Sequence, residues 1–315
     1  MSLPSREEFA HCLEHLSLYS REPPLKAAYF EKRGGVILLR LNRSDSLVIV
    51  GDIHGDYTTF STIVERSLQT LEGGGYMFLL GDYIDRGTPE GQVLTIYRLC
   101  RLTKEYPGRV VMLRGNHEPP EGLEPMPHDY PLALQTVYGS DGRRLYSLSR
   151  KLFDSLPHAI LVEGALLMLH GGPPTINLET ASRDPALYLG SDGDPEVIAE
   201  ILWNDPAELD IIRAPNPRGV GSLWGPGVTV HMARSLNIKR IVRGHEPAMR
   251  GYKLNHGGSV VTLFSRLGAP YFNSQAAFLN CKLESIVTDD IKEFLNECIA
   301  TVQPEHGEHT GFVAW

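Results

Sequence analysis

The chain has 315 residues, of which 42% are apolar and 22% are charged, and it carries a formal net charge of −8. These values are typical of a globular protein with a sizeable core, and the acidic balance argues against a surface that binds nucleic acid. No apolar run reaches the ~18 residues of a membrane span and the first residues lack the apolar core of a secretory signal, so we expect a cytoplasmic protein without a membrane partner.

The first part of the chain combines helical and strand-like apolar patterns. Apolar side chains at helical spacing predict an amphipathic helix over residues 5–19. Two apolar strands at 36–41 and 47–50 flank a polar turn at 42–45, an arrangement that favours a β-hairpin. A second amphipathic helix follows Asp56, which is well placed to cap it.

Three strands in this part of the chain each run into a polar motif. Strand 47–50 is followed by the sequence GDIHGD, strand 76–80 by GDYIDRG and strand 110–113 by RGNHE. Glycine lets the backbone turn where a side chain would obstruct it. After the second motif, Thr88 and Pro89 begin a helix in the favoured way, a cap followed by proline. Ligands of open α/β sheets bind at the C-terminal ends of strands, so these motifs are typical of a binding site.

The second part of the chain repeats this construction twice. A strand predicted at 165–169 leads to the sequence HGG, and a strand at 241–242 leads to RGHE. The other predicted elements are short helices in a proline-rich loop at 119–158, a strand at 159–162, an irregular segment at 173–226, a helix at 227–236, strands at 259–264 and 276–279, and a closing helix at 286–302. The polar tail from 303 ends in the apolar sequence FVAW, and the sequence does not indicate whether this end packs against the rest of the protein.

The cysteines give a prediction about redox state. Cys12, Cys100, Cys281 and Cys298 are far apart in the sequence, and none belongs to a CxxC pair. This spacing favours reduced thiols over a disulfide framework or a zinc site.

Six polar side chains at the ends of predicted strands form a candidate metal-binding set: Asp52, His54, Asp82, Asn116, His170 and His245. Each motif alone is compatible with an ordinary turn, but its recurrence at five strand ends favours a common site. Imidazole, carboxylate and amide ligands suit Mn, Fe, Zn or Ni. Six ligands exceed the needs of one tetrahedral metal. If Asp82 bridges, they hold two ions about 3.5–4 Å apart, the geometry of two-metal phosphoester hydrolysis.

The motifs GDIHG, GDYIDRG, LRGNHE, HGG, LWNDP, NPRGVGSLWGPGVTV and RGHE occur in this order along the chain. In order, type and approximate separation they resemble the phosphoprotein phosphatase family of metal-dependent serine/threonine phosphatases, within the calcineurin-like metallophosphoesterase superfamily. The resemblance covers about residues 47–280. It implies a central two-sheet β-sandwich flanked by helices, whereas the apolar patterns alone indicate only a mixed α/β protein. We expect one catalytic domain over 1–315, with the helix at 5–19 and the segment 285–315 as extensions.

The resemblance also implies roles for individual residues. The ligands matched to the first metal are Asp52, His54 and Asp82, and those matched to the second are Asp82, Asn116, His170 and His245. His117 matches the general acid that protonates the leaving alkoxide, and Asp85 matches the carboxylate that orients it. The residues matched to phosphate binding are Arg86, Arg218, Asn116 and Tyr271. Asp205 matches a loop acid whose role stays open, and Arg243 is predicted to be a structural or rim residue.

The sequence differs from related sequences at three places. The last motif continues as GHEP, without the second histidine of the GHxH ending found in many nucleases and phosphodiesterases of the superfamily. This difference and Arg86 favour the phosphoprotein phosphatase branch. The loop 266–272 lacks the asparagine of the usual sequence APNY, and Phe272 stands where many members have cysteine. Asp56 replaces a glutamine that is common after the first motif.

The resemblance implies a phosphoric monoester hydrolase with two divalent or trivalent ions, which we expect to be Mn²⁺, with Fe or Zn as alternatives. It would hydrolyse phosphoserine and phosphothreonine in a phosphoprotein or phosphopeptide by direct attack of a dimetal-bridging hydroxide, without a phosphoenzyme. One alternative is a hydrolase of diadenosine tetraphosphate or another small phosphoester on the same core. A second is a catalytically silent protein that uses the fold for binding.

Overall fold

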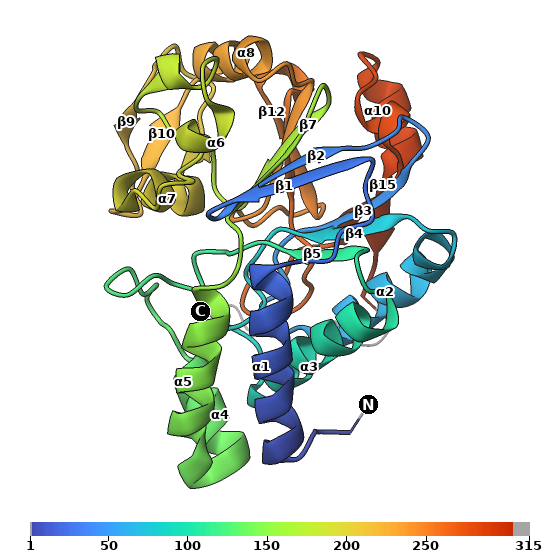
Figure 1. Ribbon diagram of the computed structural model, residues 1–315, viewed down its shortest axis with the longest axis vertical. Coiled ribbons are helices and arrows are strands. Elements are labelled where there is room, and N and C mark those ends of the chain that lie inside the picture. Colours follow the sequence, from blue (N-terminus) through green and yellow to red (C-terminus); the bar gives the residue numbers. More distant parts are fainter. Residues whose placement is uncertain (1, 305–315) are drawn as a thin grey trace, which may run out of the picture.

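Two β-sheets lie face to face within residues 2–304, the part of the chain that the computed structural model describes (Figure 1). The larger sheet has the strand order β1 (Tyr29–Arg33), β2 (Val36–Arg40), β6 (Ala159–Val162), β7 (Leu166–Leu169), β11 (Arg240–Arg243), β13 (Val260–Leu263) and β12 (Tyr252–Asn255). The smaller sheet has the order β15 (Ile299–Val302), β14 (Ala276–Lys282), β3 (Ser46–Val50), β4 (Tyr76–Leu79) and β5 (Val110–Met112). This arrangement confirms the predicted β-sandwich.

Apolar side chains from both sheets fill the space between them, among them Leu39 of the larger sheet and Ile49 and Phe78 of the smaller. Full burial of such a side chain contributes about 1.5–3 kcal/mol. A short further sheet, formed by β8 (Asp205–Pro206), β10 (Ser222–Trp224) and β9 (Ala214–Pro215), lies in the segment that was predicted to be irregular.

Helices cover the outer faces of both sheets (Figure 1). On the side of the smaller sheet lie α1 (Arg6–Arg21), α2 (Tyr57–Glu72) and α3 (Pro89–Glu105), and α4 (Tyr130–Tyr138) and α5 (Gly142–Phe153) pack against α1 and α3. Those on the larger sheet are α6 (Pro185–Tyr188), α7 (Pro195–Trp203) and α8 (Pro226–Ser235). The short helices α9 (Leu283–Ile286) and α10 (Ile291–Cys298) place apolar side chains in the core between the sheets. The 3₁₀ turns are η1 (Gly139–Asp141), η2 (Leu178–Thr180) and η3 (His256–Gly258).

The helix starts predicted after two of the motifs are confirmed by capping contacts. Asp56 accepts a hydrogen bond from the backbone N–H of Thr59 at 3.1 Å at the start of α2. Thr88 accepts one from the N–H of Gly91 at 3.0 Å at the start of α3. A cap of this kind typically stabilises by about 1 kcal/mol. The caps therefore fix where each motif loop ends and its helix begins.

The predicted hairpin between residues 36–41 and 47–50 is wrong, because the two strands belong to different sheets. β2 pairs with β1 and β6, whereas β3 pairs with β4 and β14. The polar turn itself forms, and the N–H of Asp45 donates to the carbonyl of Asn42 at 3.0 Å. Both strands are apolar on both faces, as strands buried between a sheet and helices usually are. The chain therefore crosses from one sheet to the other at this turn.

The predicted closing helix at 286–302 is wrong at both ends, because α9 ends at Ile286, α10 begins only at Ile291, and the last residues form a strand. Helix α10 ends at Cys298, and residues 299–302 form β15, which pairs antiparallel with β14 at the edge of the smaller sheet. The β-branched side chains of Ile299, Thr301 and Val302 suit a strand once an edge is available for pairing.

Two of the cysteines contradict the expectation of reduced thiols. Cys281 and Cys298 form a disulfide that links β14 to the end of α10, with their Cα atoms 4.9 Å apart. Cys12 and Cys100 are buried and free, as expected. The pairing depends on the fold, which brings together two residues that are 17 positions apart in the sequence.

The apolar end of the chain at 312–315 lies outside the described residues. Among residues 2–304, no helix combines the length and the apolar character needed to cross a membrane.

Candidate active site

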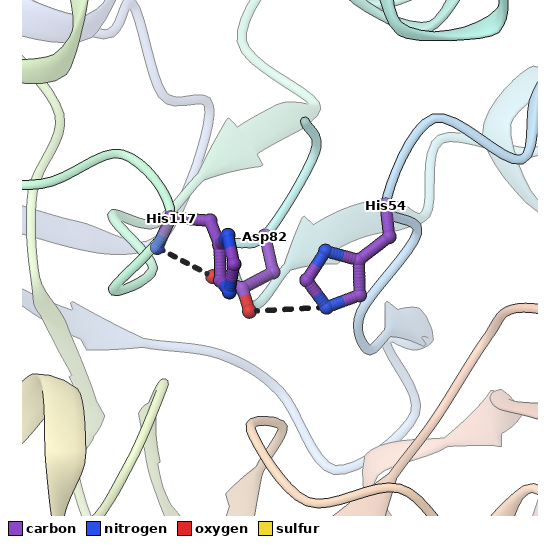
Figure 2. Close-up of side chains that lie close together, drawn as sticks. All are labelled: His54, Asp82 and His117. Carbon is purple, nitrogen blue, oxygen red and sulfur yellow. Dashed lines mark hydrogen bonds and ion pairs between the residues drawn. The ribbon is translucent and has the colours of Figure 1, made fainter. Parts of the chain in front are cut away.

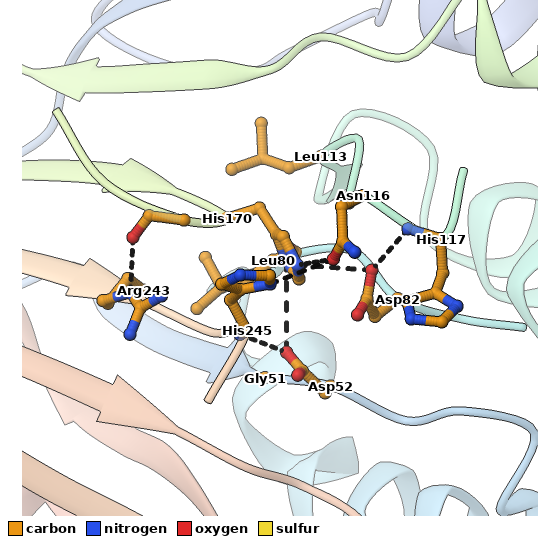
Figure 3. Close-up of polar contacts among 12 residues, drawn as sticks. Gly51, Asp52, Leu80, Asp82, Leu113, Asn116, His117, His170, Arg243 and His245 are labelled. Carbon is orange, nitrogen blue, oxygen red and sulfur yellow. Dashed lines mark hydrogen bonds and ion pairs between the residues drawn. The ribbon is translucent and has the colours of Figure 1, made fainter. Parts of the chain in front are cut away.

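The polar residues that follow five strands meet at one edge of the sandwich (Figure 3). Asp52 and His54 follow β3, Asp82 follows β4, Asn116 follows β5, His170 follows β7 and His245 follows β11. Because β3, β4 and β5 are parallel to one another, as are β7 and β11, the residues after them share an edge within each sheet. The fold thus brings the whole predicted ligand set together.

The backbone of these loops adopts an unusual conformation. His54, Asp82 and His245 have positive φ angles of 47°, 56° and 74°. Asp85 and Arg86 also have positive φ angles, of 65° and 67°. Such residues cost on the order of 1–3 kcal/mol each and cluster at functional sites. The surrounding contacts must therefore hold these side chains in directions that a relaxed turn would not give.

Two glycines are required by close approaches within the site. A Cβ atom at Gly115 would lie 2.2 Å from the Asp82 Oδ1 atom, and one at Gly244 would lie 2.3 Å from the Asp52 Oδ1 atom. These positions confirm the prediction that the motif glycines make room for the chain to turn beside the carboxylates.

One group of potential ligands consists of His54, Asp82 and His117 (Figure 2), whose ligand atoms lie within 4.8 Å of one another. His54 Nε2 is 3.4 Å from Asp82 Oδ2. The Nδ1 atom of His54 lies 2.9 Å from the carbonyl oxygen of Ile84. A carbonyl can only accept, so Nδ1 carries the proton and the lone pair of Nε2 faces Asp82.

A second group consists of Asp82, His170 and His245, again within 4.8 Å of one another. His170 Nε2 is 3.2 Å from Asp82 Oδ1 and 2.9 Å from Asn116 Oδ1. The Nδ1 atom of His170 donates to the carbonyl of Leu80 at 2.8 Å, which leaves Nε2 as the potential ligand. His245 Nδ1 is 3.0 Å from Asn116 Oδ1. Asp82 therefore lies in both groups, one oxygen toward each (Figures 2 and 3).

Asp52 joins neither of these groups of side chains. Its Oδ1 atom accepts the backbone N–H of His245 at 2.8 Å and lies 4.0 Å from His170 Nδ1. Asp52 Oδ2 and His245 Nε2 are buried and have no hydrogen-bond partner within the described part of the chain.

The electrostatics of this cluster favour a bound cation. Burial is the largest cause and repulsion from Asp82 the second, and they raise the pKa of Asp52 to about 7. A buried carboxylate without a compensating charge is costly, and so is a buried polar atom without a partner. The carboxylate, imidazole and amide donors are the types that transition-metal ions prefer. The residues present therefore fit metal ions in this cluster.

Glu118, which had no predicted role, joins two of the motif loops. It is fully buried, and its Oε2 atom accepts backbone N–H groups of Asp82 at 2.8 Å and Gly115 at 3.0 Å. Its Oε1 atom accepts the N–H of Tyr83 at 2.8 Å. Three backbone donors hold this carboxylate, which fixes the loop after β4 against the loop after β5.

His117 lies beside the metal-binding candidates and is paired with Asp85. His117 Nδ1 is 2.6 Å from Asp85 Oδ2, and its backbone N–H donates to Asp82 Oδ1 at 3.0 Å. Burial alone would lower the pKa of His117, but the charges of Asp82 and Asp85 raise it above its ordinary value. Burial likewise opposes ionisation of Asp85, yet hydrogen bonds from His117 and His128 lower its pKa. A protonated imidazole that is held beside an ionised carboxylate can act as a general acid.

A pocket of about 250 Å³ opens beside these groups and is lined in part by Arg86, Arg218 and Tyr271. The Tyr271 ring stacks on His54 with its centroid 5.7 Å away. The fold thus places these three predicted phosphate-binding residues at the same opening as His117.

Asp205 connects Arg218, which lines this pocket, to the buried Arg243. Its Oδ2 atom accepts from Arg218 Nε at 2.8 Å, and its Oδ1 atom accepts from Arg243 Nη2 at 2.9 Å. Arg243 is fully buried and also donates to the carbonyl of Gly171, which agrees with the predicted structural role. Asp205 therefore holds Arg218 in place, a role that its sequence position did not reveal.

Arg266 is a residue of the site that sequence reasoning missed. Its side chain is only 4% exposed, and its guanidinium donates to the carbonyls of His54 at 2.6 Å, Arg86 at 3.3 Å and Ala269. It also lies 5.3 Å from the centre of the Tyr271 ring. The only signal in the sequence was the altered loop at 266–272. Arg266 thus ties that loop to two residues that have left-handed backbone conformations.

We expect Arg266→Met to lower kcat/KM by about 10–100-fold, a loss of roughly 1.4–2.7 kcal/mol of transition-state stabilisation. Methionine preserves much of the volume but donates no hydrogen bond, so His54 and Arg86 lose their shared anchor. The measurement compares the phosphatase kinetics of Arg266→Met with those of Arg250→Met, a control substitution at an exposed arginine. Equal activity of the two variants would show that the anchor is dispensable.

The sequence matches the family model described as "Calcineurin-like phosphoesterase" over residues 46–249. Among curated proteins, it is 28% identical over 279 residues to "Serine/threonine-protein phosphatase T" of Schizosaccharomyces pombe, covering 82% of this chain and 55% of that protein. It is 30% identical over 236 residues to human "Serine/threonine-protein phosphatase 5", covering 71% of this chain and 44% of that protein. The chain spans about half the length of these relatives.

Solved structures show the same fold. A serine/threonine phosphatase from Saccharomyces cerevisiae, described as similar to human phosphatase PP5, matches with a TM-score of 0.67 at 21% identity, over 97% of this chain and 92% of that one. A cold-active protein tyrosine phosphatase matches with a TM-score of 0.53 at 18% identity, over 79% and 75% of the two chains. The family model and the curated relatives confirm the resemblance that the motifs indicated, and the solved structures confirm the fold.

Proposed function

The chain belongs to the calcineurin-like phosphoesterase family, and on this premise we propose that it is a metal-dependent phosphatase of phosphoserine and phosphothreonine in proteins. The observation that carries the proposal is the position of Asp82, which faces one group of potential metal ligands with each of its oxygens. The paired His117 and the two arginines of the pocket complete the set of groups that a phosphomonoesterase needs. The names of the relatives support serine and threonine as the phosphorylated residues.

We propose that the chain holds two metal ions, of which Mn²⁺ is the expected identity and Fe or Zn the alternatives. The ligands assigned to the first ion are Asp52, His54 and Asp82, and those assigned to the second are Asp82, Asn116, His170 and His245. When bound, such a pair supplies Lewis acidity that activates water and neutralises phosphate oxygens. The hydrogen bonds at Nδ1 of His54 and His170 support the assignment because they turn Nε2 of each ring inward.

Arg86 and Arg218 are proposed to hold the substrate phosphate. A planar guanidinium can donate two parallel hydrogen bonds to a phosphate and offset charge that develops in the transition state. The contact between Arg218 Nε and Asp205 supports this role because it leaves the terminal nitrogens of the guanidinium for substrate. Asn116 and Tyr271 are proposed to contact the phosphate from the sides of the pocket.

His117 is proposed to donate a proton from Nε2 to the departing oxygen of serine or threonine. An alkoxide is a poor leaving group, so proton transfer in the transition state lowers the barrier. Asp85 bonds to Nδ1 and thereby fixes the direction of Nε2.

A cytoplasmic location and a single catalytic domain stay predictions from the sequence.

The test compares substrates on protein reactivated separately with Mn²⁺, Fe²⁺ and Zn²⁺ after elemental analysis. Phosphoserine, phosphothreonine and phosphotyrosine peptides are offered beside diadenosine tetraphosphate and 4-nitrophenyl phosphate. We expect the highest kcat/KM for the phosphoserine or phosphothreonine peptides. A higher kcat/KM for the dinucleotide would indicate that the natural substrate is a small phosphoester and not a protein. Inactivity toward every compound with each metal would indicate a catalytically silent binding protein.

A further inference from the structure

The carboxylate of Asp85 is shared by two histidines. Its Oδ2 atom lies 2.6 Å from Nδ1 of His117 and 2.8 Å from Nδ1 of His128. Its Oδ1 atom accepts the backbone N–H groups of Asp129 at 2.9 Å and Tyr130 at 2.8 Å. Asp85 is fully buried, so its direction is set entirely by these protein contacts. Neither the motifs nor the resemblance assigned a role to His128.

A further contact fixes the orientation of the His128 ring. The carboxylate of Asp85 accepts hydrogen bonds, so Nδ1 of His128 is the donor toward it. Nε2 of His128 is 3.0 Å from the hydroxyl group of Tyr146 in α5. The Tyr146 hydroxyl can donate to Nε2 or accept from it, so in either case this contact holds the His128 ring with Nδ1 toward Asp85. Hydrogen bonds therefore join Tyr146, His128 and Asp85 in series, with Nδ1 of His128 as the donor toward Asp85.

The segment that contains His128 also contacts the neighbouring phosphate-binding residue. Asp129 accepts the backbone N–H of Arg86 through Oδ2 at 3.2 Å, and the carbonyl of Met126 accepts from Arg86 Nη2 at 3.3 Å. Residues 126–130 thus hold Asp85 and Arg86, two consecutive residues that both have left-handed backbone conformations. His128 is the member of this segment whose side chain contacts the carboxylate that faces His117.

We propose that His128 is a positioning residue for proton transfer by His117, an inference that rests on the proposed phosphatase function. The donor on His128 prevents Asp85 Oδ2 from rotating away, and the orientation of Oδ2 in turn sets the direction of the His117 ring. A general acid must lie within hydrogen-bond reach of the oxygen that it protonates, so a small rotation lowers its efficiency. The effect is confined to reactions in which the leaving group needs a proton.

The test uses two substrates with different leaving groups and the variants His128→Ala, His128→Asn and Tyr146→Phe. For His128→Ala we expect kcat on a phosphoserine peptide to fall about tenfold or more, with little change in KM, while kcat on 4-nitrophenyl phosphate changes less than about threefold. In His128→Asn, the amide Nδ2 can donate to Asp85 in place of Nδ1 and should restore most of the activity. Tyr146→Phe should show a smaller loss with the same dependence on the leaving group.

His231→Ala is the matched control, because His231 is another half-buried histidine, bonded to the carbonyl of Leu178 at 3.0 Å. If His128→Ala lowers kcat equally on both substrates and His128→Asn does not restore it, His128 has only a structural role. If His128→Ala leaves kcat unchanged on both substrates, His128 has no positioning role. The unaltered enzyme tests the proposed function separately. If it cleaves alkyl phosphates but no phosphopeptide, only the proposed protein substrate is wrong, and the His128 variants are then tested with glycerol phosphate in place of the peptide. If it cleaves neither, both proposals fail.

Discussion

His117→Asn is expected to lower turnover of a phosphoserine peptide by about 10²–10⁴-fold while the metal content stays near that of the unaltered protein. Asparagine can still donate to Asp85, and its backbone N–H can still bond to Asp82 Oδ1, which His117 contacts at 3.0 Å. It has no ring nitrogen that could protonate the leaving oxygen. The measurements are kcat at saturating substrate and elemental analysis of the purified variant.

The same variant separates two roles that the geometry allows for His117. The ring lies within 4.8 Å of the ligand atoms of His54 and Asp82, so it is close enough to be a ligand itself. Loss of one metal from His117→Asn would assign it to metal binding. Turnover of 4-nitrophenyl phosphate provides the control, because a good leaving group needs little protonation and should be affected much less. If the phosphoserine peptide is also cleaved at nearly the normal rate, the acid assignment is wrong.

Asp82→Asn is expected to lower the occupancy of both metal sites together and to abolish most of the activity. The Asp82 oxygens lie 3.4 Å from His54 Nε2 and 3.2 Å from His170 Nε2, so the side chain faces both groups of ligands. The substitution keeps the shape but removes the charge and replaces one oxygen by an NH₂ group, which cannot coordinate a cation. The ratio of metal to protein, measured by elemental analysis after purification without added metal, tests this expectation.

Asp154→Asn is the control for that change, since Asp154 is an exposed carboxylate that pairs with Arg114 at 3.0 Å. It should retain both metals and full activity. Retention of one metal in Asp82→Asn, with loss of the other, would contradict a bridging carboxylate and would leave two independent sites.

Much of the candidate site was predictable because its signals are local. Glycine, a carboxylate or histidine, and a helix cap follow an apolar strand within a few residues. Asp56 and Thr88 confirm that such caps can be predicted from neighbouring residues. The types of ligand at five strand ends also indicated metal chemistry before any distance was known. Local patterns failed at 299–302, because an apolar run is compatible with a helix or a strand until a sheet edge is available.

The sequence by itself determined which residues end the strands and which ligand types they carry, since strand periodicity, turns and caps depend on neighbours within about four residues. Only the tertiary structure decided that the strands on either side of the 42–45 turn enter different sheets and that Cys281 pairs with Cys298. It also decided the contacts of Arg266, whose guanidinium bonds to the carbonyl of His54 across 212 residues of sequence. The partners of buried polar groups are fixed by how sheets and helices pack, and no local pattern encodes that packing.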